Sequence, residues 1–118
     1  MHLTDSEWKI ADCLWKNKSM TLTELTKELG SSIGWNKSTI ITLVKRMIEK
    51  GAVTYIQEGR TKRFYPALGR DEAELEETRS FLKKVYQGNV GLMISKLICS
   101  DELTNEQLED IRRLIEED

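Results

Sequence analysis

The chain has 118 residues, of which 39% are hydrophobic and 32% are charged. This length suits one full domain with an appendage and excludes two ordinary domains. No apolar run approaches the ~20 residues of a membrane helix, and the first residues lack the basic-then-apolar pattern of a secretory signal. We therefore expect a cytoplasmic protein that does not engage the membrane.

Charge is divided unevenly along the chain, although the net charge is only −2. Residues 1–70 contain 12 Lys and Arg against 7 Asp and Glu, whereas residues 71–118 contain 6 against 13. A basic first part joined to an acidic second part indicates a surface for a polyanion in the first and a different task for the second.

The cysteine and histidine content argues against a metal site or a disulfide framework. Cys13 and Cys99 lie far apart, each within an apolar helical pattern, and His2 is the single histidine. Because free cysteines are usually buried, we expect two buried thiols. No Ser-His-Asp set, glycine-rich phosphate loop or HExxH motif is present, so we expect no cofactor, no metal and no enzymatic activity.

Capping signals and apolar spacing predict two helices near the N-terminus. The first begins at a Thr-x-x-Glu capping box, residues 4–7, and runs to about Lys16. A polar break at residues 17–19 precedes a second box, residues 21–24, that starts a short helix. Residues 30–34, Gly-Ser-Ser-Ile-Gly, are predicted to form a turn.

A third helix is predicted from Asn36, which can cap its N-terminus, to Gly51, where a left-handed residue is expected. Trp35, just before it, is expected to pack on the core and not to stack on a base. Apolar positions at helical spacing predict its buried stripe, which comprises Ile40, Leu43, Val44, Met47 and Ile48.

A two-stranded hairpin is predicted next. Residues 52–57 and 61–65 are rich in β-branched and aromatic side chains and flank a Glu-Gly-Arg turn. Pro66 ends the second strand, because proline cannot continue a hydrogen-bond ladder. Three helices followed by a hairpin is the order of a winged helix-turn-helix, so we expect residues 1–70 to be a winged helix-turn-helix DNA-binding domain.

Residues 71–118 are predicted to form a helical dimerisation domain, which makes the whole chain mainly α with a small β-hairpin. Helical patterns cover residues 71–86 and 92–98, with glycines loosening the chain between them, and a third capping box opens a last helix at residues 104–107. So few residues bury their apolar stripes poorly alone, which favours pairing with a second copy; folding back on the first domain is the alternative. The expected dimer contacts are Phe81, Leu82, Val85, Tyr86, Leu92, Met93, Leu97, Leu108, Ile111, Leu114 and Ile115.

The third helix is expected to read DNA, because the second helix of a helix-turn-helix pair lies in the major groove. Small polar and basic side chains crowd its exposed side. The expected base contacts are Lys37, Ser38, Thr39 and Thr42, the expected phosphate contacts are Lys45 and Arg46, and Asn36 combines helix capping with a place in the interface.

The hairpin tip carries three further cations, Arg60, Lys62 and Arg63. Such a cluster fits the DNA backbone or minor groove, where charge attracts without reading sequence. The alternative is a charged turn that protects an exposed edge strand from pairing with other chains.

Several segments together form a recognisable combination: Leu3–Trp8, Ile10–Trp15, Trp35–Thr39, Thr42–Arg46, Lys50–Ala52, Glu58–Arg60, and Phe81-Leu82 with Tyr86 and Gly88. With these, the sequence resembles the penicillinase and methicillin-resistance repressors, the BlaI/MecI/CopY group, over nearly its whole length. The resemblance implies a homodimeric repressor that binds inverted repeats in promoters and interlocks through its C-terminal helices. By position it assigns DNA reading to Lys37, Ser38, Thr39, Thr42 and Arg46, and the wing to Arg60.

Two departures from that family bear on induction. Antibiotic-responsive members are cleaved at an Asn-Phe bond, where this chain has Lys96-Leu97, and copper-responsive members carry a C-terminal CxC pair that this chain lacks. We therefore expect neither route of induction, and a sensor protease that cuts at another bond stays a candidate partner.

The sequence as a whole predicts a transcriptional repressor that binds double-stranded DNA as a homodimer, with control of antibiotic resistance as an implied role. Activation in place of repression is one alternative. A winged-helix protein-interaction module without specific DNA binding is another, and the clustered cations of residues 1–70 argue against it.

Overall fold

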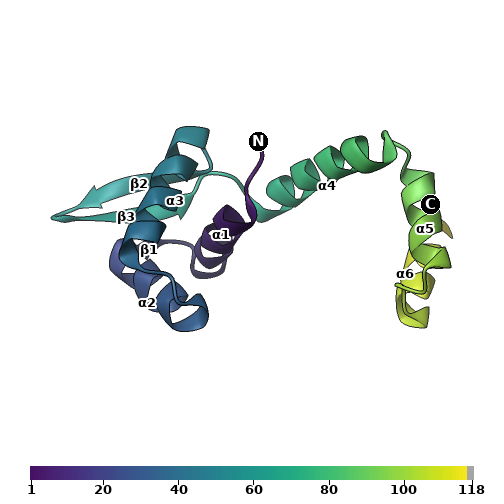
Figure 1. Ribbon diagram of the computed structural model, residues 1–118, viewed down its shortest axis with the longest axis horizontal. Coiled ribbons are helices and arrows are strands. Elements are labelled where there is room, and N and C mark those ends of the chain that lie inside the picture. The colour runs from purple at the N-terminus through teal and green to yellow at the C-terminus, as the bar shows by residue number, and fades with distance from the viewer. Residues whose placement is uncertain (117–118) are drawn as a thin grey trace. The chain divides into compact units, whose positions relative to one another are not determined.

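The computed structural model describes residues 1–116, which contain six helices and three strands (Figure 1). They form two compact units, Met1–Glu77 and a second that begins at Thr78, so the division falls inside the fourth helix, a few residues beyond the expected boundary after residue 70. The predicted fold class is confirmed. In chain order the elements are α1 (Asp5–Asn17), β1 (Met20–Thr21), α2 (Leu22–Ile33), α3 (Lys37–Lys50), β2 (Val53–Glu58), β3 (Thr61–Pro66), α4 (Arg70–Tyr86), α5 (Val90–Cys99) and α6 (Asn105–Glu116).

Both capping boxes expected near the N-terminus are present. Thr4 Oγ1 accepts the Glu7 N–H at 3.2 Å, while Glu7 Oε1 accepts the Thr4 N–H at 2.8 Å. Thr21 and Glu24 repeat this reciprocal pair at 3.2 and 3.0 Å. Each box satisfies backbone donors that the first turn of a helix leaves unpaired, and so places the starts of α1 and α2.

The prediction of a turn at residues 30–34 was wrong, because α2 continues to Ile33. Ser31 and Ser32 donate their hydroxyls to carbonyl groups one turn earlier, at 3.0 and 2.8 Å, and both remain helical. The helix ends only at Gly34, whose φ of +75° is the left-handed conformation that glycine adopts without a Cβ clash.

Helix α3 has the predicted ends. The Asn36 side chain accepts the Thr39 N–H at 2.9 Å, and Gly51 follows the helix with a φ of +82°. Trp35 packs against the core, as expected. The predicted stripe is confirmed, with four of its side chains buried and Ile48 half-buried.

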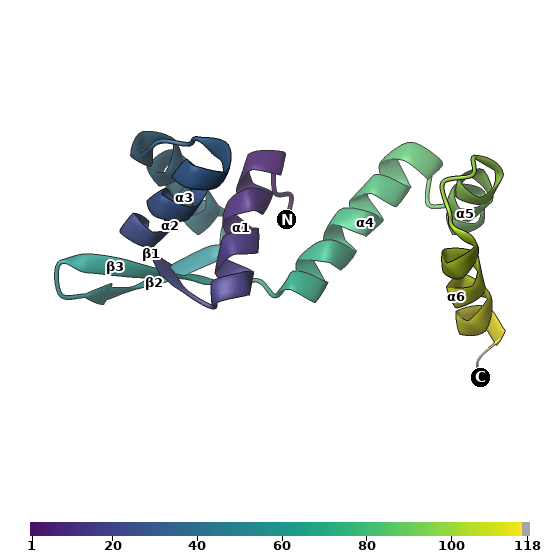
Figure 2. The ribbon, with the colours of Figure 1, turned by 90° about the horizontal axis from the view of Figure 1, so that it is seen from below.

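The predicted hairpin forms, with Tyr55 opposite Phe64 and Glu58 opposite Thr61. The sequence did not indicate β1, whose Met20 pairs with Phe64 on the other side of β3, so that the sheet order is β1-β3-β2. Two residues are too few to show the alternation of apolar and polar side chains that indicates a strand. The strand that β1 pairs with, β3, also lies far along the chain. Figure 2 shows α1, α2 and α3 on one side of this sheet, with the hairpin projecting beyond them.

The core of the first unit lies between these helices and the sheet. Apolar burial stabilises it by roughly 25 cal/mol per Å² removed from water. The side chains with less than 2% exposure include Ile10, Leu14, Leu25, Ile40 and Met47.

The start of α4 is attached to this first unit. Ala73 is buried, and the Trp15 indole N–H donates to the Leu68 carbonyl at 2.8 Å just before the helix. Arg70 donates to Asp12 Oδ1 at 2.6 Å and lies over the Trp15 ring, 4.9 Å from its centroid. These contacts hold the first turn of α4 on α1.

In the second unit, α6 begins at the predicted capping box, in which Thr104 and Gln107 bond reciprocally at 2.9 and 3.1 Å. Helix α5 begins earlier than expected, because Asn89 caps it by accepting the Leu92 N–H at 3.0 Å. Gly91 therefore lies within the helix and not in the loosened connection that we predicted.

The two cysteines differ. Cys13 is buried, as predicted, but Cys99 is exposed, and the prediction of a second buried thiol was wrong for this single chain. The reason is that α5 has no fully buried residue, so its last turn has no core to enter.

Candidate nucleic-acid interface

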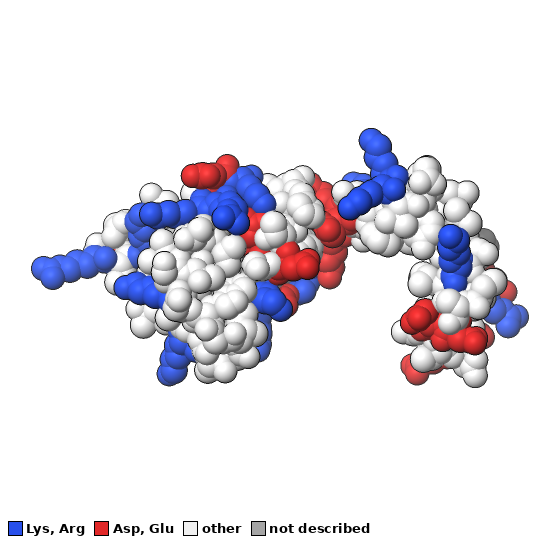
Figure 3. Space-filling view, viewed as in Figure 1, with Lys and Arg blue, Asp and Glu red and all other residues white. Residues whose placement is uncertain are grey.

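One face of α3 is polar and exposed while the opposite face is buried. All predicted DNA-reading side chains of this helix lie on the exposed face, and the buried stripe anchors the helix to the first unit. Figure 3 shows lysine and arginine side chains gathered over α3 and the β2–β3 hairpin. The exposed set comprises Asn36, Lys37, Ser38, Thr39, Thr42, Lys45 and Arg46.

Two of these polar side chains are already engaged within the helix. Asn36 uses its side-chain oxygen to cap the Thr39 N–H, and Thr42 donates its hydroxyl to the Ser38 carbonyl at 3.0 Å. The hydroxyl hydrogen of Thr42 is therefore occupied, which leaves its oxygen lone pairs and its methyl group for a ligand. A threonine methyl can contact the methyl group of thymine.

The other end of α3 is held by an ion pair between the buried Glu7 and the partly exposed Lys50. Lys50 Nζ lies 2.5 Å from Glu7 Oε1 and 2.9 Å from the His2 carbonyl oxygen. Glu7 is fully buried, and burial alone raises its pKa, but hydrogen bonds from Lys50 and Thr4 outweigh burial and lower the pKa overall. The sequence identified Glu7 only as a capping residue, because no local signal indicates a partner 43 residues away.

The hairpin places two of its predicted cations outward. Arg60 is exposed at the turn beside Gly59, whose φ of +61° permits the tight reversal. Lys62 is also exposed, and its ammonium lies 4.5 Å from the centroid of the Tyr55 ring. This cation–π contact orients the lysine without neutralising its charge.

Arg63, the third predicted cation, is half-buried and pairs with acids of its own chain. Its Nε donates to Glu58 Oε1 at 2.8 Å, and its Nη1 lies 3.4 Å from Glu24 Oε1. The hydrogen bond to Glu58 is the main cause of its raised pKa. The structure therefore brings Arg63 to the base of the wing and to α2, whereas Arg60 and Lys62 face outward.

The predicted dimer residues lie on α4, α5 and α6, and none is fully buried in this single chain. Phe81 and Tyr86 form an edge-to-face pair, with ring centroids 6.0 Å apart. The same apolar pattern on α5 also includes two residues outside the predicted set, Val90 and Ile98, which are 47% and 45% exposed. The exposed members are Phe81, Val85, Leu92, Leu97, Leu114 and Ile115, and the half-buried members are Leu82, Tyr86, Met93, Leu108 and Ile111.

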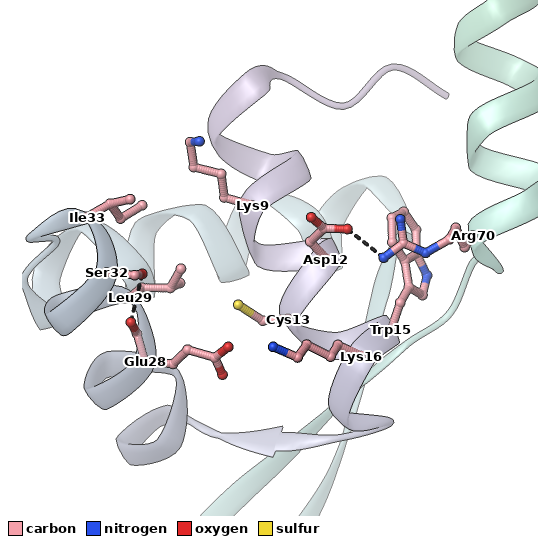
Figure 4. Close-up of a pocket in the computed structure, with 10 residues that line it drawn as sticks. All are labelled: Lys9, Asp12, Cys13, Trp15, Lys16, Glu28, Leu29, Ser32, Ile33 and Arg70. Carbon is pink, nitrogen blue, oxygen red and sulfur yellow. Dashed lines mark hydrogen bonds and ion pairs between the residues drawn. The ribbon is translucent and has the colours of Figure 1, made fainter. Parts of the chain in front are cut away.

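A cavity of about 460 Å³ lies between α1 and α2 in the first unit (Figure 4). The Cys13 sulfur points into it, and the ion pair of Arg70 with Asp12 lies at its edge. Burial raises the pKa of the Cys13 thiol to about 11, so this thiol is protonated and unreactive at neutral pH. The cavity therefore holds no activated nucleophile.

Comparison with known proteins decides what kind of protein carries this interface. The family model described as penicillinase repressor matches residues 3–117. The chain belongs to the penicillinase repressor family. The family resemblance inferred from the sequence and the predicted class of function, a DNA-binding transcriptional repressor, are confirmed at the level of the family.

Three known proteins show how similar this repressor is to other members of the family. The penicillinase repressor of Bacillus licheniformis is 29% identical over 98% of this chain and 90% of its own length. The methicillin resistance regulatory protein MecI of Staphylococcus aureus strain N315 is 20% identical over 96% and 92%. The solved Bacillus licheniformis BlaI, in its monomeric form in complex with the blaP half-operator, is 30% identical with a TM-score of 0.55, covering 61% of this chain and 88% of that one.

Two further observations concern residues 1–116 of this repressor. Within them, no group of three or more His, Cys, Asp and Glu side chains is placed to hold a metal ion. No helix in that range is long and apolar enough to cross a membrane. Family members are repressors and not enzymes.

Proposed function

We propose that this repressor binds an inverted-repeat operator in promoter DNA as a homodimer and blocks transcription there. The observation that carries the proposal is the exposed polar face of α3 beside an outward-facing cationic wing, in a member of the penicillinase repressor family. The related BlaI protein was solved in complex with a half-operator, which supports DNA as the ligand of the corresponding surface. A repressor that binds promoter DNA acts where transcription takes place, so the proposal includes a cytoplasmic location.

The residues of the interface divide by what they can contact. Lys37, Ser38, Thr39 and Thr42 belong to the first two turns of α3, the part of a recognition helix that meets base edges. Lys45 and Arg46, farther along the same face, suit phosphates that flank the major groove. Arg60 and Lys62 suit the backbone beside the wing, because lysine and arginine neutralise phosphates without reading sequence.

Homodimerisation is supported by the apolar surface of the second unit. Six of its predicted contact residues are exposed, and α5 and α6 contain no fully buried side chain. A two-fold axis would cover these stripes with the same stripes of a second copy. It would also present two α3 helices to two half-sites, which is how operator symmetry follows protein symmetry.

The test is a titration of the full chain against its own promoter region and against random DNA of equal length, at two salt concentrations. We expect specific binding with protection of an inverted repeat. Sedimentation analysis of the complex should give the mass of one operator with two bound chains. Equal and weak binding to both DNAs would contradict the proposal. Binding of a single chain to one half-site would contradict the proposed homodimer but not the proposed DNA binding.

A further inference from the structure

Two adjoining clefts lie where α2, α3 and the wing meet, and Leu22, Lys62 and Phe64 line both of them. The first cleft has a volume of about 310 Å³, at the lower end of the ~300–1,000 Å³ typical of small-molecule sites. Its remaining lining residues are Ile41, Val44, Lys45 and Ile48. Apart from the two lysines, every side chain that lines this cleft is apolar.

The second cleft, of about 340 Å³, is cationic. Lys37, Arg60 and Lys62 line it from α3 and the wing, and the rest of its lining is neutral. It also borders Thr21, Leu22 and Thr23 at the start of α2. Because no carboxylate lines either cleft, nothing within the lining competes for these cations.

We propose that the two clefts form one binding site for a small amphipathic anion, an aromatic or aliphatic group that carries one carboxylate. The apolar part enters the cleft beside Ile41 and Ile48, where burial from water drives binding. The carboxylate lies in the second cleft against Lys62 and its neighbouring cations, where charge-assisted hydrogen bonds select an anion over a neutral analogue.

Binding of this anion weakens DNA binding, a consequence that rests on the proposed function. Lys37, Lys45, Arg60 and Lys62 line the clefts and also belong to the proposed DNA interface. An anion held there neutralises cations that phosphates would otherwise meet, and its bulk lies between α3 and the wing. The site is therefore an effector site that competes with DNA.

The cavity between α1 and α2 provides an internal comparison. It is larger, but Asp12 and Glu28 share its lining with Lys9, Lys16 and Arg70. Mixed charge gives no preference for an anion, so this cavity should not take the same ligand. Ile33, which lines it, reports on this cavity in the experiment below.

The experiment follows isoleucine and leucine methyl signals by NMR in the full chain, with three probes added in turn. The probes are 2-naphthoate, its neutral analogue 2-naphthamide, and acetate as an anion without an apolar part. We expect 2-naphthoate to shift Leu22, Ile41 and Ile48 but not Ile33 or Ile56. Naphthamide should bind at least about tenfold more weakly, the loss of a charge-assisted contact, and acetate should shift none of them.

Charge variants then locate the carboxylate. Lys62→Gln should weaken 2-naphthoate binding about tenfold and leave naphthamide binding unchanged, while the matched control Lys16→Gln should change neither. Absence of methyl shifts in the cleft, shifts centred on Ile33, or equal binding of naphthoate and naphthamide would each overturn the site.

The same probes are added to the protein bound to its promoter DNA. We expect 2-naphthoate to weaken this complex several-fold more than equimolar naphthamide or acetate do. Unchanged DNA affinity at saturating naphthoate would overturn the effector role. Absence of specific DNA binding before any probe is added would count against the proposed function instead, and the methyl shifts would still decide whether the anion site exists.

Discussion

Arg63 and Glu24 join the wing to the start of α2. Arg63 Nη1 lies 3.4 Å from Glu24 Oε1, the oxygen that also accepts the Thr21 N–H at 3.0 Å in the capping box. Thr21 in turn pairs with Arg63 between β1 and β3. The pKa of Glu24 is lowered, chiefly by the hydrogen bond from the Thr21 backbone, with a smaller contribution from Arg63. One charged oxygen therefore connects the hairpin, the short strand and the helix.

This relationship predicts different roles for two arginines of the wing. Arg60→Gln should remove one phosphate contact per chain, two per dimer, and reduce the slope of log K against log salt by about 1.8. Arg63→Gln should leave that slope nearly unchanged, because its charge is already paired with Glu58 and Glu24. It should instead speed amide hydrogen exchange in β2 and β3, as the hairpin loses its attachment to α2. If both variants flatten the salt dependence equally, Arg63 contacts DNA and the positioning role is wrong.

The ion pair of the buried Glu7 with the partly exposed Lys50 predicts an asymmetric response to mutation. Lys50→Met leaves a fully buried carboxylate without its cation and should cost about 3–5 kcal/mol of unfolding free energy. Glu7→Gln should cost less, about 1–2 kcal/mol, because the partly exposed lysine can reach water. Urea denaturation of the two variants measures this order. A larger loss in Glu7→Gln than in Lys50→Met would contradict it.

The same pair predicts acid sensitivity. The pKa of Glu7 in the folded protein lies below its ordinary value of 4.5, so the folded state binds fewer protons than the unfolded state in this range. The contribution of Glu7 is therefore complete above about pH 4.5 and is lost as pH falls through the lower folded-state pKa. Glu7→Gln should remove this part of the pH dependence, as measured by urea denaturation from pH 7 downward.

Features that depend on neighbouring residues could be predicted from the sequence. Three capping boxes, the Asn36 cap, the Gly51 terminus and the stripe of α3 all rest on spacings of a few residues. The end of α2 was missed because two serines that usually favour turns bond instead to the preceding turn of their own helix.

Contacts between distant parts of the chain could not be predicted in this way. The strand β1, the partner of Glu7 and the partners of Arg63 each depend on residues brought together by folding. In the sequence, the three cations of the hairpin tip look equivalent. Only the fold shows that Arg63 pairs with acidic side chains of its own chain, while Arg60 and Lys62 face outward. The role of each proposed DNA contact stays a prediction.

Thr42 offers a test of base contact, because its hydroxyl hydrogen is already bonded to the Ser38 carbonyl. Thr42→Val keeps the methyl group and the β-branched shape, and should bind promoter DNA within about twofold of the natural protein. Thr42→Ser removes the methyl group and should lose about 1 kcal/mol of specific binding, with random DNA little affected. Titration of both DNAs distinguishes the variants. A larger loss of promoter binding in Thr42→Val than in Thr42→Ser would show that the hydroxyl oxygen, and not the methyl group, makes the contact.

The proposed homodimer predicts that a single charge on the apolar surface of the second unit separates the two copies. Phe81→Glu and Leu97→Glu each place a carboxylate on an exposed apolar position, and a two-fold interface contains each substitution twice. The dimer dissociation constant should rise at least about a hundredfold, because two unpaired charges would be buried. Sedimentation equilibrium measures this constant, and circular dichroism checks that the helices remain.

Ile56→Glu provides the matched control for these two variants, since Ile56 is an exposed apolar residue of the wing, in the first unit. It should leave the dimer intact. Phe81→Glu and Leu97→Glu should lose affinity for the full operator while keeping the weaker affinity of one winged helix for a half-site. If both variants stay dimeric, or if Ile56→Glu dissociates the protein, the second unit does not hold the dimer together. The copies would then have to pair through the first unit, where the exposed apolar residues Ile33 and Ile56 would be the first to test.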